Sequence, residues 1–411
     1  TGLLNRDQFY EDVHDMVNKY HDTTFYLICS NIKDFKFINE IFGMEKGNQV
    51  LIKQAKLMAS NPSERTICAR LMNDRFALCL PREEFDEKRV ADSIKELQRE
   101  FSGNSFHLHT YMGVYEIRDR DEAVSIMVDK ANIAADTIKN NYDCCVAYYD
   151  EHLLEISIEQ RRLLGEFEPA LQNDEFVMYL QPQVKRDGAA KGAEALVRWV
   201  HPSRGILTPY AFIDILENAG LIYKLDLYIW EKAAQKLAEW KEKGYGSYHI
   251  SVNISTKDFY IIDIYETFTG LINKYGIAAS NLHLEITETT LMTDFEKNMN
   301  IIHKLQGVGF RVEIDDFGSG YSSLNMLKDI SADVLKIDMG FLRKSENEVK
   351  GQDILESIIT LAGKIGMDVI TEGVETKKQL DMLTMMGCHE FQGYYFSKPV
   401  PVSEFEEKYL V

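Results

Sequence analysis

The pattern of apolar and polar positions divides the chain into two parts joined by a helix. From Thr24 to about Ala147, apolar runs such as FYLICSNI and RFALCL alternate with amphipathic stretches at 86–101 and 122–139. This alternation predicts an α/β or α+β domain with a central sheet. In residues 151–172, apolar side chains recur among charges, which predicts a connecting helix.

The second part alternates strand-like runs with helical patterns from Glu175 onward. We predict eight strands, at 176–184, 192–200, 248–255, 282–287, 310–315, 333–338, 367–372 and 390–396. The intervening helices are predicted at 223–243, 256–274, 293–308, 351–366 and 375–386. This order is typical of a (β/α)8 barrel. The link from 184 to 192 is too short for a crossover helix, so we expect the first strand to pair antiparallel with the second.

The expected fold class is therefore α/β, with an N-terminal domain at 1–150, a connecting helix at 151–172 and a barrel domain at 173–411. Hydrophobic residues make up 45% of the 411 residues, which excludes a disordered chain and suits two or three domains. The net charge is −19, and residues 151–411 hold 40 of the 65 acidic side chains. Such acidity disfavours a protein that coats nucleic acid or binds an anionic membrane surface, although acidity by itself usually means only solubility.

The cysteine pattern indicates a cytoplasmic setting for this fragment. None of the six cysteines has CxxC spacing, and we expect them to be reduced and buried. The sequence contains no signal peptide pattern and no apolar run long enough for a membrane span. It begins at Thr1 inside what looks like a motif, so we expect a fragment whose upstream sensor or membrane segment is not visible.

Acidic and amide side chains gather where the predicted barrel strands end, which is where barrel enzymes place their active residues. These positions hold Glu194, Arg198, Asn253, Glu285, Glu288, Asp315, Asp316, Lys336, Asp338, Glu372 and Glu375, with Gln392 on the eighth strand. One such acid would usually be a helix cap or a turn residue. Several together repel one another when buried and need a positive partner. Oxygen ligands without His or Cys suit Mg²⁺ or Mn²⁺ rather than Zn²⁺.

The adjacent pair Asp315 and Asp316 could hold two ions, with one side chain bridging them. Two such ions can activate a water and stabilise the leaving oxygen of an in-line displacement at phosphorus. Lys336 would add a fixed positive charge beside the nucleophile or the phosphate. Phosphodiester hydrolysis is the reaction that this set favours. The following segment FGSGYSS (317–323) lacks the lysine of a P-loop and is interpreted as a turn.

The second part resembles the EAL-domain phosphodiesterases of cyclic di-GMP over about 170–411. Eight ordered motifs carry the resemblance: EAL (194–196), QPQ (181–183), VNIS (252–255), EITE (285–288), DDFGSGYSSL (315–324), LKID (335–338), EGVE (372–375) and QGYYFSKP (392–399). A lone EAL tripeptide would mean nothing, whereas eight motifs in order exclude chance.

The resemblance implies a role for each matching position. The first metal would be held by Glu194, Asn253, Glu285 and Asp315, and the second by Asp315, Asp316 and Glu372. Lys336 would orient the nucleophilic water, and Glu372 would also be the general base. Gln392 would support the water network, and Glu288 would steady the DDFG loop.

The same resemblance implies the substrate contacts and the assembly. Gln181, Leu196 and Arg198 would hold the dinucleotide, with Glu375 nearby. The product would be linear pGpG, and the protein would be a homodimer joined through its barrels. Thr371 departs from the alanine that commonly precedes EGVE, which changes little.

The first part resembles a GGDEF domain, the diguanylate cyclase fold. The match runs from TGLLNR (1–6) through SNIKDFKFINEIFGMEKGNQVL (30–51) and RLMNDRFALCLP (70–81) to VDKANIAADTIKNN (128–141). The signature GGDEF reads MNDRF at 72–76, so both glycines are lost and Arg75 replaces the catalytic glutamate. Asn31 replaces one metal-binding aspartate, and only Asp74 of that pair remains.

The substrate contacts of a cyclase are mostly replaced as well. Asn48 stands where an aspartate would bind guanine, although Asn39 is present, and the triphosphate-binding Lys and Arg align with Asp136 and Asn140. The inhibitory RxxD motif aligns with residues 63–66, which read SERT. We therefore expect no cyclase activity and favour a structural or dimerising role over GTP-dependent regulation.

Two functions remain for the barrel. The first is metal-dependent hydrolysis of cyclic di-GMP. The alternative is a non-catalytic cyclic di-GMP receptor that signals to a protein partner, but such receptors typically lack a metal ligand and none is missing from this sequence.

Overall fold

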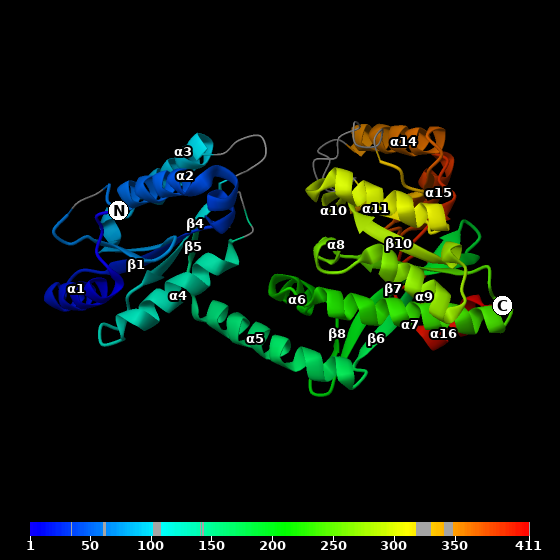
Figure 1. The fold of residues 1–411 in the computed structure, drawn as a ribbon, viewed down its shortest axis with the longest axis horizontal. Helices are drawn as coiled ribbons and strands as arrows, with labels where there is room; N and C mark the ends of the chain where they lie inside the picture. The colour runs from blue at the N-terminus through cyan, green and yellow to red at the C-terminus, as the bar shows by residue number, and fades with distance from the viewer. Residues whose placement is uncertain are drawn as a thin grey trace. The chain divides into compact units, whose positions relative to one another are not determined.

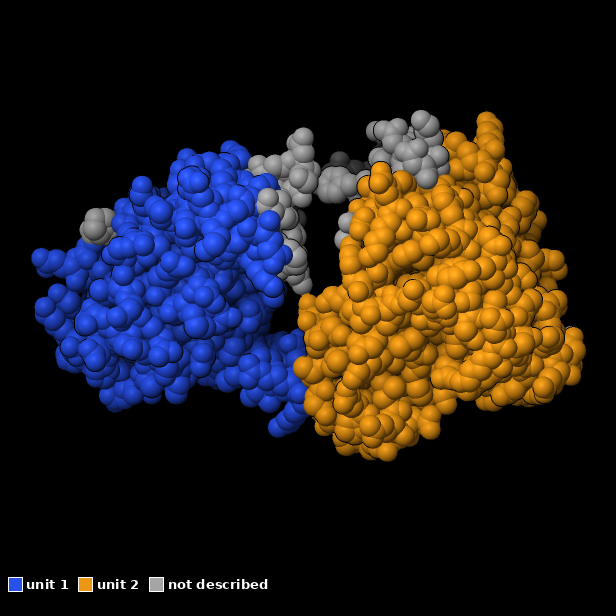
Figure 2. Space-filling view, in the orientation of Figure 1, with its two compact units in different colours: residues 1–162 blue, residues 163–411 orange. Residues whose placement is uncertain are grey.

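The computed structural model describes residues 1–33, 35–60, 63–101, 108–139, 141, 144–317, 330–340 and 348–410. These residues form two compact units, Thr1–Arg162 and Leu163–Val411, which are coloured separately in Figure 2. Helix α5 (Glu151–Gln172) matches the predicted connecting helix. The units divide within α5, because Leu163 and Phe167 belong to the hydrophobic core of the barrel.

The first unit is a five-stranded sheet in the order β2-β3-β1-β4-β5 (Figure 1). The strands are β1 (Phe25–Ile32), β2 (Ile67–Met72), β3 (Arg75–Pro81), β4 (Thr110–Glu116) and β5 (Val146–Tyr148). Only β4 and β5 run parallel; the other pairs are antiparallel. The helices are α1 (Arg6–Lys19), α2 (Phe35–Met58), α3 (Glu87–Phe101) and α4 (Val124–Thr137).

Helices cover both faces of this sheet because the inner strand β1 is apolar on both sides. Tyr26 and Ile28 face a core completed by α2 and α3. Phe25 and Leu27 face a second core completed by α1 and α4. Side chains alternate between the two faces of a strand, so a continuous apolar run predicts burial on both faces.

The second unit is a closed barrel. Its strands are β6 (Phe176–Lys185), β7 (Ala190–His201), β9 (His249–Ile254), β10 (Leu282–Thr287), β11 (Val312–Phe317), β12 (Val334–Asp338), β13 (Asp368–Glu372) and β14 (Glu390–Phe391). Neighbours from β7 to β14 are parallel, and β6 closes the barrel with antiparallel pairing to both β7 and β14. The predicted fold class and the antiparallel first strand are thus confirmed.

The outer layer of the barrel consists of helices and two short edge strands. The helices are α6 (Ile213–Ala219), α7 (Ile222–Glu242), α8 (Asp258–Ile261), α9 (Ile264–Tyr275), α10 (Glu288–Thr293), α11 (Phe295–Val308), α14 (Glu348–Lys364), α15 (Lys377–Met385) and α16 (Val402–Tyr409). The edge strands are β8 (Gly205–Leu207) and β15 (Val400–Pro401). The sequence patterns did not predict α6, α10, α16, β8 or β15.

Two element predictions were wrong in extent. The predicted strand 390–396 ends at Phe391, because Tyr395 N donates to the Val374 carbonyl at 2.9 Å and the amides of Phe396 and Ser397 bond to the Gly393 carbonyl. These bonds close a turn in place of a ladder. The predicted helix 256–274 is two helices, because Asp263 caps α9 by accepting a hydrogen bond from Glu266 N.

All six cysteines are free, four of them buried and two half-buried. Within the described ranges, no helix has the length and apolar character that a bilayer crossing requires.

Candidate functional site at the C-terminal mouth of the barrel

Four acidic side chains meet one lysine where the parallel strands end. Lys336 on β12 is 1% exposed, and its ammonium forms four ion pairs. Its Nζ lies 2.7 Å from Glu372 Oε1 and 2.9 Å from Glu285 Oε2. Glu194 Oε2 and Asp315 Oδ1 are each 3.4 Å away. One buried cation is therefore shared by carboxylates from four other strands, β7, β10, β11 and β13.

Amide side chains hold Glu194 from both sides. Asn253 Nδ2 on β9 donates to Glu194 Oε1 at 3.1 Å, and Gln392 Nε2 donates to Glu194 Oε2 at 2.5 Å. Gln392 Nε2 also contacts Gln181 Oε1 at 3.3 Å. Gln181 in turn donates to the Ser397 carbonyl at 3.3 Å. This chain of amides fixes the orientation of the Glu194 carboxylate.

A β-bulge brings the adjacent acids Asp315 and Asp316 to the same site. In a regular strand, neighbouring side chains point to opposite faces. Between Ile314 and Phe317, β11 contains one residue more than the facing stretch of β12. Asp316 has a φ of 55° there, a conformation that costs a non-glycine residue about 1–3 kcal/mol. Burial is the main cause that raises the pKa of the Asp316 carboxyl. The nearby negative charges of Asp315 and Asp338 raise it further.

The acids of the site outnumber the lysine, and their pKa values reflect the excess negative charge. Burial, reinforced by Asp315 and Glu194, raises the pKa of Glu372 to about 8 although Lys336 opposes the shift. Burial and the charge of Glu194 also raise the pKa of Glu285 well above its usual value. Burial alone would lower the pKa of Lys336, but the surrounding carboxylates raise it.

Several oxygens of this cluster lack hydrogen bonds. Within the described part of the chain, Glu285 Oε1 is buried and has neither a hydrogen bond nor an ion pair, whereas the buried Asp315 Oδ1 and Glu372 Oε1 have the Lys336 ammonium as their partner. Carboxylate oxygens in excess of the available donors are the ligands that hard divalent cations bind. The side chains present therefore fit Mg²⁺ or Mn²⁺.

The predicted substrate residues lie beside the cluster on β6 and β7. Leu196 and Arg198 follow Glu194 at two-residue steps, so the three side chains share one face of β7. The Arg198 guanidinium lies 5.5 Å from the centre of the Tyr179 ring, and its Nη1 donates to the Val197 carbonyl at 2.8 Å. A guanidinium placed in this way retains further N–H donors for a phosphate.

Two predicted residues lie at the edge of the site. Glu288 is the first residue of α10, next to its N-cap Thr287, and is half-buried. Glu375 is exposed between β13 and α15, and its backbone N–H donates to Gln379 Oε1 at 2.9 Å. Residues 318–329 lie outside the described residues, so the expected contact of Glu288 with the DDFG loop and the turn at 317–323 stay predictions.

The sequence analysis assigned no role to Asp338, although it noted the residue at a strand end. Asp338 is two residues beyond Lys336 on β12, and its Oδ1 accepts a hydrogen bond from Gly340 N at 2.5 Å. Its charge contributes to the raised pKa of Asp316. The i, i+2 spacing from Lys336 was the signal that could have placed it in the site.

In the first unit, the region that holds the GGDEF signature position (72–76) differs in charge from the acidic site of the barrel. Met72 pairs with Arg75 across a tight turn, in which Asn73 takes a φ of 52° at a position where the GGDEF signature has glycine. Asparagine tolerates this conformation better than most residues. Burial raises the pKa of Asp74 and of Asp136, and the positive charge of Arg75 counteracts both shifts. The charge of Arg75 therefore acts on both acids, and at Asp136 Lys139 acts in the same direction.

Asn31 is held by a neutral partner in the same region. Its Nδ2 donates to the Tyr111 hydroxyl at 3.0 Å, and its Oδ1 accepts from Ile32 N at 3.0 Å. An amide in this position adds no negative charge for a cation. Asn140, predicted to replace a triphosphate ligand, lies outside the described residues.

Comparison with known proteins agrees with both halves of this description. Residues 165–399 match the EAL domain family, and residues 1–143 match the diguanylate cyclase GGDEF domain. The chain belongs to the EAL domain family and carries a GGDEF domain before the EAL domain.

Its relatives combine the same two domains in longer proteins. The bifunctional diguanylate cyclase/cyclic di-GMP phosphodiesterase MucR of Pseudomonas aeruginosa is 30% identical over 393 residues, which cover 93% of this chain and 57% of MucR. The cyclic di-GMP phosphodiesterase PdeR of Escherichia coli is 26% identical and matches 100% of this chain and 62% of PdeR. The chain thus spans about three fifths of these relatives.

A solved structure described as the PaMucR phosphodiesterase in complex with c-di-GMP is similar to the barrel. It is 33% identical and superposes with a TM-score of 0.57, covering 59% of this chain and 99% of that structure.

Proposed function

We propose that the barrel hydrolyses cyclic di-GMP to linear pGpG in a reaction that requires divalent cations. The observation that carries this proposal is the convergence of Glu194, Glu285, Asp315 and Glu372 on the single ammonium of Lys336, which leaves the acids in excess and Glu285 Oε1 without a partner among the described residues. The likeness to PdeR and to the PaMucR complex supports the choice of substrate.

Each residue of the cluster has a place in this reaction. Divalent cations would be held by Glu194, Asn253, Glu285, Asp315, Asp316 and Glu372, and would supply positive charge that acidifies a water and neutralises the phosphate. Glu372 has a pKa of about 8 without divalent ions; bound cations would lower that pKa and leave the carboxylate ionised, ready to accept the proton of the attacking water. Lys336 keeps the Glu372 carboxylate in place through its 2.7 Å ion pair.

The substrate is positioned from β6 and β7. Arg198 meets a phosphate with its guanidinium, while Leu196 offers an apolar contact one step closer to the acids. Gln392 donates to the Glu194 carboxylate and also to Gln181 Oε1, which orients the Gln392 amide, so that in-line attack takes place against a fixed set of oxygens.

The test is a turnover assay on the purified chain with Mg²⁺ or Mn²⁺, in which cyclic di-GMP and pGpG are separated by chromatography. We expect conversion to pGpG, and we expect Glu194→Gln, which keeps the shape and removes the charge, to abolish it. Tight binding of cyclic di-GMP without turnover would instead favour the receptor alternative. Turnover that is equal in the Glu194→Gln variant would refute the proposal.

We also propose that the first unit does not synthesise cyclic di-GMP. The support is electrostatic: Arg75 introduces a positive charge beside Asp74, where a cyclase would bind a metal, and Asp136 would repel a triphosphate. MucR is described as bifunctional, so a direct test is required. GTP is incubated with the Glu194→Gln chain, which cannot consume the product, and we expect no cyclic di-GMP. Its accumulation would overturn this part.

A homodimer through the barrels is proposed from family likeness only. Light scattering on the purified chain, with and without cyclic di-GMP, measures its mass directly, and a monomer in both conditions would contradict the proposal.

A further inference from the structure

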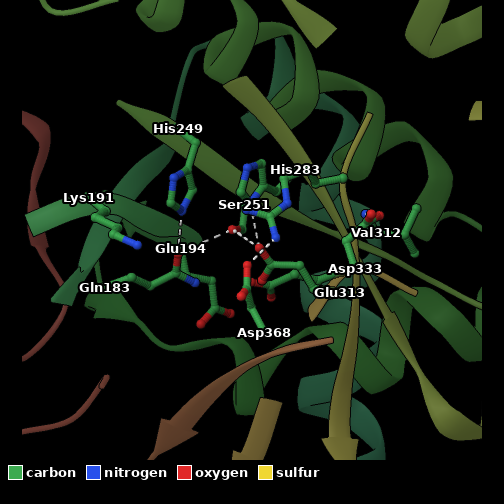
Figure 3. A network of polar contacts seen from close by, with 12 residues as sticks. Gln183, Lys191, Glu194, His249, Ser251, His283, Val312, Glu313, Asp333 and Asp368 are labelled. Atoms are coloured by element: carbon green, nitrogen blue, oxygen red, sulfur yellow. Dashed lines mark hydrogen bonds and ion pairs between the residues drawn. The ribbon is translucent and has the colours of Figure 1, made fainter. Parts of the chain in front are cut away.

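The interior of the barrel is also polar at its N-terminal mouth, opposite the candidate active site. Barrel interiors are ordinarily filled by branched apolar side chains. Here, three adjacent parallel strands place His249, His283 and Glu313 inside, at the first residue of β9 and the second residues of β10 and β11 (Figure 3). They are buried, with relative exposures of 9%, 3% and 0%. No role described above accounts for them.

The three side chains are close enough to share one ion. One ligand atom from each lies within 4.8 Å of the other two. The imidazole rings of His249 and His283 are stacked with their centres 3.9 Å apart and their planes at 4°. His283 Nδ1 lies 2.6 Å from Glu313 Oε1. Two imidazole nitrogens and one carboxylate form a ligand set that is common for Zn²⁺.

Both imidazoles are oriented by hydrogen bonds through their other nitrogen. His249 Nε2 donates to Gln183 Oε1 at 2.7 Å, which leaves the lone pair on Nδ1. His283 Nε2 donates to the Ser280 carbonyl at 3.2 Å and directs Nδ1 at the carboxylate. Such outer partners are usual for metal-binding histidines, because they fix the tautomer and the ring orientation.

The local backbone makes room for this arrangement. Gly192 on β7 pairs with His249 on β9, and a Cβ at position 192 would lie 2.4 Å from the His249 ring. Beyond the rings, a cavity of about 500 Å³ opens to the mouth, lined by both histidines and Glu313. Glu313 Oε1 accepts from Ser251 Oγ at 3.2 Å, whereas Oε2 is buried and has no hydrogen bond to any residue that the structure describes.

The charges around the cavity favour a cation. Lys191 is already paired with Glu390, and Arg311 Nη2 lies 2.5 Å from Asp368. The Glu313 carboxylate is paired with His283 Nδ1 at 2.6 Å, and a cation bound in place of the proton between them would meet the same negative charge. Burial and the adjacent His283 lower the pKa of His249 to about 3, so His249 is neutral, which is the form that binds metals.

We propose that His249, His283 and Glu313 bind one Zn²⁺ at the N-terminal mouth of the barrel. With bonds of about 2.0–2.2 Å, the ligand atoms would lie about 3.4 Å apart. The two stacked rings would have to tilt out of their parallel arrangement to direct both lone pairs at the ion. The ion takes the place of the proton between His283 and Glu313. It ties together β9, β10 and β11, the strands that also carry Asn253, Glu285 and Asp315.

This proposal goes beyond the proposed hydrolysis and does not depend on it. The active-site acids offer only oxygen ligands and one amide, which suit Mg²⁺ or Mn²⁺, whereas the mouth offers two nitrogens. In excess Mg²⁺ the active-site acids are occupied by Mg²⁺, so Zn²⁺ binding measured under this condition reports on the mouth.

The experiment measures Zn²⁺ binding to the purified full chain in excess Mg²⁺, by competition with a chromophoric chelator. Co²⁺ serves as a second probe through the visible absorption of tetrahedral Co²⁺. We expect one tightly bound Zn²⁺ per chain and a tetrahedral Co²⁺ spectrum. The His249→Gln/His283→Gln variant should bind Zn²⁺ at least about 100-fold more weakly, and Gln183→Leu about 10- to 100-fold more weakly.

Two further variants guard against misfolding and nonspecific binding. Gly192→Ala keeps every ligand but displaces the His249 ring, so it should also lose tight binding, while circular dichroism confirms the fold. His303→Gln, an exposed histidine on α11, should bind like the wild type. The proposal is overturned if the wild type binds Zn²⁺ no more tightly than the His249→Gln/His283→Gln variant. If that variant does not fold, the proposal is overturned when the wild type binds Zn²⁺ no more tightly than Gly192→Ala and Gln183→Leu.

Discussion

Replacing Lys336 with methionine removes the one cation that the described residues place at the centre of the acidic cluster, while keeping a side chain of similar length. Four carboxylate oxygens lie 2.7–3.4 Å from its Nζ. The acids that are ionised then lose their counter-charge in the barrel interior, where Glu285 is completely buried. Removing one partner of a buried ion pair costs about 3–5 kcal/mol.

This loss of stability can be measured as a decrease in the unfolding temperature. In a domain of about 250 residues, 1 kcal/mol shifts the unfolding temperature by about 2–4 °C, so we expect the barrel of Lys336→Met to unfold about 6–20 °C lower in the presence of a chelator. Saturating Mn²⁺ should narrow the gap, because the ions replace the missing positive charge and stabilise the folded state by mass action. Hydrolysis should be absent in both conditions.

The assay is calorimetry of the full chain with a chelator and with Mn²⁺, compared with Lys304→Met. Lys304 is an exposed lysine on α11, and its replacement should change the free energy of unfolding by no more than about 0.5 kcal/mol. If Lys336→Met unfolds at the wild-type temperature without divalent ions, or if Mn²⁺ widens the difference, the lysine does not balance the charge of these acids.

Three further predictions concern the same site. Without divalent ions, the pKa of Glu372 is raised from 4.5 to about 8, so between these pH values the native state keeps a proton that the unfolded state releases. The free energy of unfolding in urea should therefore fall as the pH rises from 4.5 to about 8. A flat profile would contradict the assignment. Asp316→Asn keeps a residue that tolerates the left-handed φ but removes the charge, so kcat should fall about 100-fold or more with an unchanged unfolding temperature; near-normal kcat would show that Asp316 holds no ion. Arg198→Ala should lower kcat/KM about 10- to 100-fold, the value of a charge-assisted hydrogen bond, and an unchanged kcat/KM would remove Arg198 from the substrate contacts.

The sequence predicted the fold well where periodicity is local. Strand 282–287 has the predicted bounds, and α5 coincides with the predicted helix 151–172. Prediction was less accurate where hydrogen bonds from distant residues decide the structure. The strand predicted at 390–396 stops early because Val374, about 20 residues away, takes the hydrogen bond of Tyr395.

The residues of the site could be predicted, but their arrangement could not. Strand ends pointed to Glu194, Glu285, Asp315 and Glu372, because parallel strands share one edge. The bulge that turns Asp316 toward the same site leaves no mark in the spacing of the chain, since it depends on the register between β11 and β12.

The polar interior of this barrel has a physical cost that its outer layer offsets. Strands buried on both faces usually form near-continuous apolar runs, yet β9 alternates. Ile250, Val252 and Ile254 are 0–3% exposed in the hydrophobic core between the strands and the helices, while His249 and Asn253 face inward. Because packing against the helices supplies the hydrophobic stabilisation, the inner face is free to carry polar side chains at both mouths. An alternating pattern within parallel strands therefore marks a barrel whose interior is used for binding, and here it extends from the Lys336 cluster to the two histidines at the opposite end.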